Sequence, residues 1–210
     1  MIRRLIILLL IVGCATNTVN TALSEPIEPA DDPCVELWGE CYSIKNTTEI
    51  ALFKRGATGD FTNVIGEIPS EIGNLINLRA LALDGNKLTG TIPAELGKLK
   101  NLTYLNLGKN KLIGEIPEDI WNLTNLIILN LGSNQLSGEI SNNLGNLENL
   151  RDLNLAGNLF TGSIPVEIGN LKKLEELILG GNKLNGVIPK NIENLTNLFI
   201  LSLNNNQLNG

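Results

Sequence analysis

Few side chains in this chain of 210 residues could carry out chemistry. The chain contains no histidine, which removes the commonest general base and metal ligand of proteins. No serine or cysteine lies in a nucleophile elbow, and there is no glycine-rich phosphate loop. The carboxylates of Glu115, Glu118, Asp119 and Glu139 fall on positions with no sign of a cleft around them. The sequence therefore predicts a protein that is not an enzyme and that needs no metal or cofactor.

Three cysteines are the remaining reactive side chains. Cys14 follows an apolar run, whereas Cys34 and Cys41 lie close together further along. Without histidine, two neighbouring cysteines make a poor metal or redox site, although that alternative stays open. The role of each cysteine depends on the elements around it.

A strict repeat of 24 residues defines those elements, since the same pattern opens at Leu75, Leu99, Leu123, Leu147, Leu171 and Leu195. In each unit two leucines alternate with outward residues, as Leu105 and Leu107 do, which is typical of a half-buried strand. Because each strand returns after a fixed interval, the strands must stack in parallel and in register. The repeat predicts one curved sheet.

Three further columns of identical residues have structural explanations. An asparagine follows each strand where the chain turns inward, and its amide can pair with backbone groups of neighbouring coils: Asn86, Asn110, Asn134, Asn158, Asn182 and Asn206. Glycines then recur where a tight bend or close approach leaves no room for a side chain, from Gly90 to Gly210. An Ile-Pro pair follows in most units, so we expect extended segments or short helical turns on the convex side.

The unit LxxLxLxxNxLxGxIPxxIG resembles the plant-type leucine-rich repeat, over residues 66 to 210. That resemblance implies an α/β-type repeat that is mostly β: a leucine-rich-repeat solenoid with a parallel concave sheet and short 3-10 or extended convex segments. It also implies a second, short sheet beside the concave one. Similar repeats occur in plant receptor-kinase ectodomains, polygalacturonase-inhibiting proteins and microbial surface proteins. Trp121, which replaces a repeat glycine, is interpreted as a plug between coils, and Phe160 as a core substitution.

At the N-terminus, Arg3 and Arg4 precede an apolar run too short to span a bilayer, and the run ends at Ile11-Val12-Gly13-Cys14. These residues resemble the signal sequence and lipobox of a bacterial lipoprotein. The resemblance implies a signal peptide over residues 1–13, lipidation of Cys14 and a lipid bilayer as a partner. An ordinary secretory signal is the alternative. The polar, acidic residues 14–33 predict a disordered tether.

Residues 34–74 are expected to form an N-terminal cap and an irregular first repeat. Asp32-Pro33-Cys34 and Trp38-Gly39 with Cys41 resemble, in part, the cap that precedes plant-type repeats. The resemblance implies a disulfide between Cys34 and Cys41, in a segment that covers the leucines of the first coil. Seven extra residues enter the stretch from Phe53 to Ile65, either a binding loop or a decayed capping unit.

Residues 75–210 form the regular repeats, five full units and a sixth that stops at Gly210, with Leu201, Leu203 and Leu208 exposed. We expect either a fragment of a longer chain or an end that is buried against a partner.

The outward strand positions predict a binding face on the concave side, the surface that such proteins offer to partners. Tyr104 is the strongest anchor, because binding hot spots favour tyrosine over small residues. Asp152 and Glu176 add an acidic patch. The predicted ligand-binding residues are Tyr104, Asn106, Ile128, Asn130, Asp152, Asn154, Glu176 and Ile178.

The charge balance narrows the class of partner. The formal net charge is −6 and no basic stripe is present, which excludes nucleic acid as the expected ligand. We expect a cell-envelope lipoprotein that binds a protein, peptide or glycan. The alternatives are a secreted inhibitor of an extracellular hydrolase and the truncated ectodomain of a receptor kinase.

Overall fold

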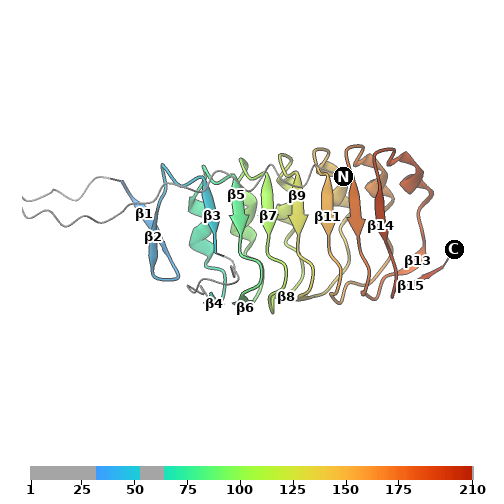
Figure 1. The fold of residues 1–210 in the computed structure, drawn as a ribbon, viewed down its shortest axis with the longest axis horizontal. Helices are drawn as coiled ribbons and strands as arrows, with labels where there is room; N and C mark the ends of the chain where they lie inside the picture. Colours follow the sequence, from blue (N-terminus) through green and yellow to red (C-terminus); the bar gives the residue numbers. More distant parts are fainter. Residues whose placement is uncertain (1–31, 53–63, 210) are drawn as a thin grey trace, which may run out of the picture. The chain divides into compact units, whose positions relative to one another are not determined.

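The computed structural model describes residues 32–52 and 64–209 of the chain. Within that part, seven short parallel strands stack side by side in one sheet (Figure 1). They are β3 (Glu49–Ala51), β5 (Ala80–Ala82), β7 (Tyr104–Asn106), β9 (Ile128–Asn130), β11 (Asp152–Asn154), β12 (Glu176–Ile178) and β14 (Ile200–Ser202). Leu105, Leu129 and Leu153 are partners in successive strands, so the pairing keeps the register of the sequence repeat. The predicted parallel concave sheet is confirmed.

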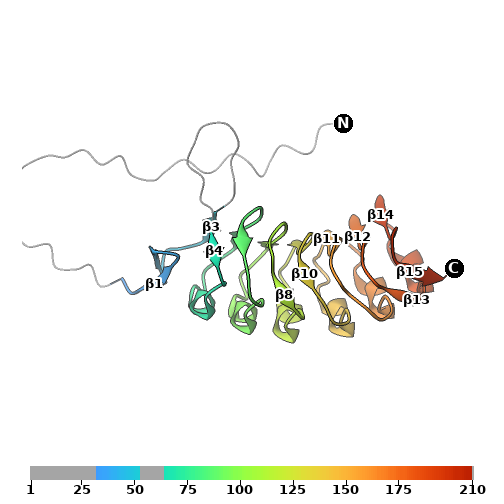
Figure 2. The ribbon, with the colours of Figure 1, turned by 90° about the horizontal axis from the view of Figure 1, so that it is seen from below.

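In the described part of the chain, six five-residue 3-10 helices line the opposite, convex side (Figure 2). They are η1 (Ser70–Asn74), η2 (Ala94–Lys98), η3 (Glu118–Asn122), η4 (Asn142–Asn146), η5 (Val166–Asn170) and η6 (Lys190–Asn194). Five of them follow a proline, and η4 follows Ser141, whose hydroxyl accepts a hydrogen bond from the Asn143 N–H. The expectation of short helical turns in place of full helices is confirmed.

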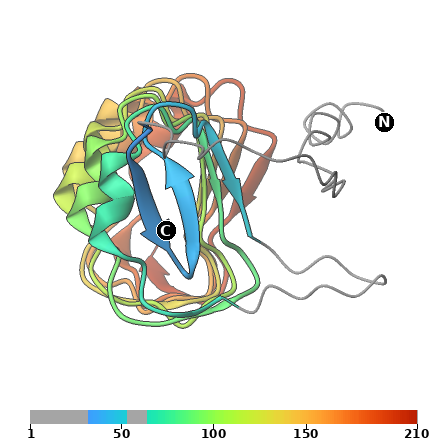
Figure 3. The same cartoon turned by 90° about the vertical axis from the view of Figure 1, so that its left-hand side faces the viewer.

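Short strands lie beside the main sheet (Figure 1), where the chain passes from the concave to the convex side, a passage seen end-on in Figure 3. They are β4 (Ile65–Gly66), β6 (Lys87–Leu88), β8 (Ile113–Gly114), β10 (Gln135–Leu136), β13 (Asn185–Val187) and β15 (Gln207–Asn209). They pair in parallel as β4–β6, β8–β10 and β13–β15, and hydrogen bonds such as Lys111 N to Leu88 O (2.8 Å) connect the pairs. The resemblance implied a second, short sheet here, and the structure has separate parallel pairs of strands in its place.

The core is a continuous stack of leucines and isoleucines between the sheet and the 3-10 helices. Leu105, Leu129 and Leu153 are completely buried, and so is Phe160. Trp121 is 1% exposed, so its interpretation as a plug between coils is confirmed. At the last coil Leu201 is 47% exposed, while Leu203 and Leu208 are partly buried.

The predicted asparagine ladder is confirmed in detail. Asn134 Nδ2 donates to Leu131 O in its own coil and to Leu107 O in the preceding coil, both at 3.0 Å. Its Oδ1 accepts from Leu112 N, also at 3.0 Å. One buried side chain thus satisfies three backbone groups that the sheet leaves unpaired.

An antiparallel hairpin of β1 (Cys34–Leu37) and β2 (Glu40–Ser43) packs against η1 at the start of the stack. The implied disulfide is present: Cys34 and Cys41 are bonded, with their Cα atoms 5.6 Å apart. Val35 and Leu37 enter the core, whereas Trp38 packs against its margin and donates its indole N–H to Glu67 O at 3.2 Å.

Cys14, the expected signal and almost all of the tether lie outside the described residues, as do residues 53–63 of the expected insertion. Among the residues that the structure describes, none forms a helix with the length and apolarity that a bilayer crossing requires.

Candidate functional site

A shallow hollow of about 250 Å³ lies on the exposed face of the main sheet, over β7, β9, β11 and β12. All eight residues predicted as ligand-binding line it: Tyr104, Asn106, Ile128, Asn130, Asp152, Asn154, Glu176 and Ile178. Leu129 and Leu153, which are part of the core, also contribute to the lining. The structure therefore brings every predicted contact residue to one place.

Three asparagines form the middle of this hollow, and their side chains share one hydrogen-bonding pattern. Each Oδ1 accepts from the backbone N–H two residues later: Asn106 from Gly108 (3.1 Å), Asn130 from Gly132 (3.0 Å) and Asn154 from Ala156 (3.0 Å). Because the oxygen is committed to the backbone, the amide Nδ2 is the group left to donate. Asn106 Nδ2 donates to Tyr104 Oη at 3.1 Å. Within the described part of the chain, the Nδ2 groups of Asn130 and Asn154 make no hydrogen bond.

The small residues that follow these asparagines have a packing explanation that sequence reasoning missed. A Cβ atom on Gly132 would lie 2.7 Å from Asn154 Oδ1 in the next coil, closer than real Cβ atoms come. The amide of one coil thus occupies the space over the glycine of the coil before it. The glycines at this position therefore leave room for the asparagine amides of the next coil.

The hollow changes chemistry along the stack. Tyr104 and Ile128 are register partners on β7 and β9, and they make one end aromatic and apolar. Asp152 and Glu176 are register partners on β11 and β12, and they make the other end acidic. Partial burial raises the pKa of Asp152, and the carboxylates of Glu176 and Glu175 raise it further against the opposing effect of Arg151.

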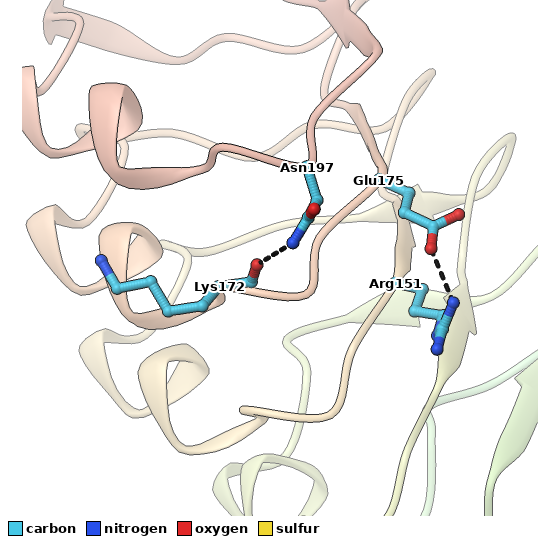
Figure 4. Close-up of polar contacts among 4 residues, drawn as sticks. All are labelled: Arg151, Lys172, Glu175 and Asn197. Atoms are coloured by element: carbon cyan, nitrogen blue, oxygen red, sulfur yellow. Dashed lines mark hydrogen bonds and ion pairs between the residues drawn. The ribbon is translucent and has the colours of Figure 1, made fainter.

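An ion pair lies beside the acidic end. Arg151 Nη1 donates to Glu175 Oε1 at 2.7 Å, and the two side chains are 55% and 35% exposed (Figure 4). Both residues immediately precede the acids of the hollow in sequence. The guanidinium is therefore engaged by Glu175, which leaves Asp152 and Glu176 facing each other.

Sequence reasoning also missed a second asparagine ladder on the exposed turns that precede the strands. Asn125 Nδ2 donates to Lys100 O at 2.8 Å, and Asn197 Nδ2 donates to Lys172 O at 2.7 Å (Figure 4). The signal was present, because asparagine recurs two residues after the first leucine of most units. Lys173 interrupts the column and instead donates to Asn149 Oδ1 at 2.7 Å.

A larger recess of about 630 Å³ lies over the Ile-Pro segments at the start of the stack. Its lining consists of residues that the repeat uses structurally, such as Ile92 and Pro93, together with the carboxylates of Glu67, Glu95 and Glu115. It contains no aromatic or amide side chain. The smaller hollow is the better candidate, because it combines an anchor, hydrogen-bond donors and charge.

Within residues 32–52 and 64–209, no three cysteine, aspartate or glutamate side chains gather closely enough to hold a metal ion. The arrangement in the hollow suits recognition, since hydrogen bonds hold its tyrosine and asparagine side chains and its surface is open.

Comparison with known proteins identifies the family. The family model described as "Leucine-rich repeat region" matches residues 63–157, and the family model described as "Leucine Rich Repeat" matches residues 149–171 and 173–195. The ectodomain of the Arabidopsis thaliana receptor kinase SOBIR1 is 35% identical, with a TM-score of 0.59, and the match covers 62% of this chain and 72% of that one. The chain belongs to the leucine-rich-repeat family.

Two further solved structures resemble it more closely in sequence. The plant peptide hormone receptor RGFR1, solved in complex with RGF2, is 45% identical with a TM-score of 0.68, over 69% of this chain and 23% of that one. A leucine-rich-repeat protein of Leptospira interrogans, LIC12759, is 45% identical with a TM-score of 0.61, over 69% of this chain and 36% of that one. The chain thus spans about a quarter of the length of the receptor. No curated protein matches it.

Proposed function

We propose that this protein is a recognition scaffold that binds a peptide or a segment of a protein in the hollow over β7, β9, β11 and β12. The observation that carries the proposal is the convergence of Tyr104, three asparagine amides and two carboxylates on one open surface. RGFR1, a receptor of the same fold, is a peptide hormone receptor, and its resemblance supports a peptide ligand.

The hollow has the features that recognition needs. Tyr104 provides a large side chain held by the hydrogen bond from Asn106, and rigid aromatic anchors contribute strongly to binding. The Nδ2 groups of Asn130 and Asn154 can donate to backbone carbonyls of an extended ligand. Leu129 and Leu153 beneath them provide a packed floor.

Charged substitutions in the hollow test this proposal. In the full chain, Tyr104→Glu with Asn130→Asp should reduce capture of the partner from an envelope extract at least tenfold. The reason is that a bound ligand would remove the two new carboxylates from water without pairing them. The variant Val166→Glu with Asn142→Asp is the matched control, since both positions are exposed on the convex helices. Equal capture by the hollow variant and the wild type, with both folded by circular dichroism, would rule out this site.

We further propose that the repeats belong to the plant-type class and that the protein is a lipoprotein of the cell envelope, anchored to the bilayer through Cys14. The lipobox-like sequence before Cys14 supports the anchor. On this proposal the chain divides into the signal peptide (1–13), the tether (14–33), the cap and first repeat (34–74) and the repeats (75–210).

Intact mass spectrometry of the mature protein tests the anchor. We expect an N-terminus at Cys14 that carries a diacylglyceryl and an acyl adduct, together with recovery of the protein in the membrane fraction. A mature chain without a lipid adduct would contradict the lipoprotein assignment and would favour the secreted inhibitor.

A further inference from the structure

The polarity of the hollow along the stack restricts what can occupy it. Tyr104 and Ile128 form its apolar end on β7 and β9, whereas Asp152 and Glu176 form its acidic end on β11 and β12. Neighbouring strands of a sheet are about 4.8 Å apart, so the centres of the two ends are separated by roughly 10 Å. A ligand that fills the hollow must meet both ends.

Neither carboxylate of the acidic end takes part in a salt bridge within the described residues. Arg151 is paired with Glu175, and within the described residues no lysine or arginine forms an ion pair with Asp152 or Glu176. The adjoining strands present Ile128 and Asn130 on β9 and Ile200 and Ser202 on β14, all of them uncharged. Like charges on register partners are destabilising, and partial burial increases the effect. A cation placed between the two carboxylates would relieve this repulsion.

The centre of the hollow offers donors in place of acceptors. The Oδ1 atoms of Asn130 and Asn154 are bonded to backbone N–H groups, so the two Nδ2 groups remain for a ligand. Backbone carbonyls of an extended segment are acceptors of matching chemistry. An extended chain advances about 3.3 Å per residue, so two or three residues span most of the distance between the ends, and a long basic side chain covers the remainder.

We infer that the hollow selects an extended peptide segment carrying a lysine or arginine two or three residues from an aromatic or aliphatic residue, with the basic side chain between Asp152 and Glu176. The apolar residue lies against Tyr104 and Ile128. This inference rests on the proposed function, because it specifies the ligand of the same surface. Asp152 and Glu176 determine specificity, whereas Tyr104 and the asparagines bind any extended segment.

Synthetic peptides test the inference directly. The probes are fluorescein-labelled octapeptides on a glycine-serine background, with one tyrosine and one lysine separated by one to five residues, and each has a twin with norleucine in place of lysine. Anisotropy with the full chain at pH 7 should show that lysine peptides with a separation of two or three bind about tenfold more tightly than their twins. Asp152→Asn with Glu176→Gln should abolish this preference, so that the lysine peptides and their norleucine twins bind the variant equally.

A charge-matched variant controls for long-range electrostatics. Glu148→Gln with Glu193→Gln also removes two negative charges, but from exposed positions outside the hollow, and should keep the tenfold preference. The preference should also weaken on acidification. Since the pKa of Asp152 is raised, its carboxylate is protonated at a higher pH than an ordinary aspartate, and the attraction for lysine is present above that pKa and lost below it.

The outcomes separate the inference from the proposed function. A lysine preference that survives Asp152→Asn with Glu176→Gln, or its absence in the wild type, overturns the inference. Failure of the wild type to bind any of the peptides overturns it as well. The proposed function is judged independently, by whether Tyr104→Glu with Asn130→Asp loses the captured partner.

Discussion

Asparagine has three different roles in this protein, and the column in which it lies determines which one it takes. Asn134 is buried and joins two coils through three backbone hydrogen bonds. Asn125 is exposed and makes one such bond. Asn130 bonds its own strand end and keeps its amide donor available. The same side chain therefore stabilises the core, tethers a surface turn or presents a donor to a ligand.

This difference predicts very unequal effects of truncation. Asn134→Ala should lower the free energy of unfolding by about 3–5 kcal/mol, because several buried backbone groups lose their partner at about 1–3 kcal/mol each. Asn125→Ala should lower it by about 0.5–1.5 kcal/mol, because water can replace one exposed bond. Urea denaturation of both variants gives the comparison. Similar losses in the two variants would show that the inner ladder contributes no more than the outer one.

The eight residues of the hollow were predictable individually, because alternation in the strand places them outward and the fixed repeat places them side by side. Their hydrogen bonds were not predictable, since the bond from Gly132 N to Asn130 Oδ1 depends on backbone geometry after the strand ends. The pairing of Arg151 with Glu175 was not predictable either. It joins side chains 24 residues apart whose directions are set by the structure.

At the scale of the elements, the Ile-Pro pairs predict the short convex helices, but they do not predict how closely helices of neighbouring coils pack. Where the repeat has glycine, as at Gly97, an added Cβ would lie 2.3 Å from Asp119 Cβ in the next coil. Trp121 occupies the equivalent position in η3 and is buried. It fits there because η3 and η4 pack less closely than the other neighbouring helices do, which leaves room for the indole. Its indole N–H is buried without a hydrogen-bond partner within the described residues. The sequence identifies the exception, and only the packing explains how the stack accommodates it.

The N-terminal hairpin was only partly predicted. The disulfide between Cys34 and Cys41 followed from a resemblance, and the structure contains it. The segment that carries Trp38 was expected to cover the leucines of the first coil. Within it, Val35 and Leu37 provide the buried apolar side chains, and Trp38 packs beside them. Alternation along β1 determines this outcome, since its burial pattern places every second residue inward.

At the scale of the whole molecule, stability is expected to be local, because each coil of a solenoid contacts mainly its neighbours. Removing the disulfide with Cys34→Ala and Cys41→Ala should cost about 2–3 kcal/mol through the greater freedom of the unfolded hairpin. The loss should be concentrated in the adjacent coils. The Leu52 amide, which donates to Ala82 O at 2.8 Å, should lose roughly 30-fold to 100-fold of its protection against hydrogen exchange. The Leu179 amide, which donates to Ser202 O at 2.8 Å in a distant coil, should change by less than about threefold. Equal losses at Leu52 and Leu179 would show instead that the coils unfold as one cooperative unit, and ligand binding in the hollow would then depend directly on the integrity of the hairpin.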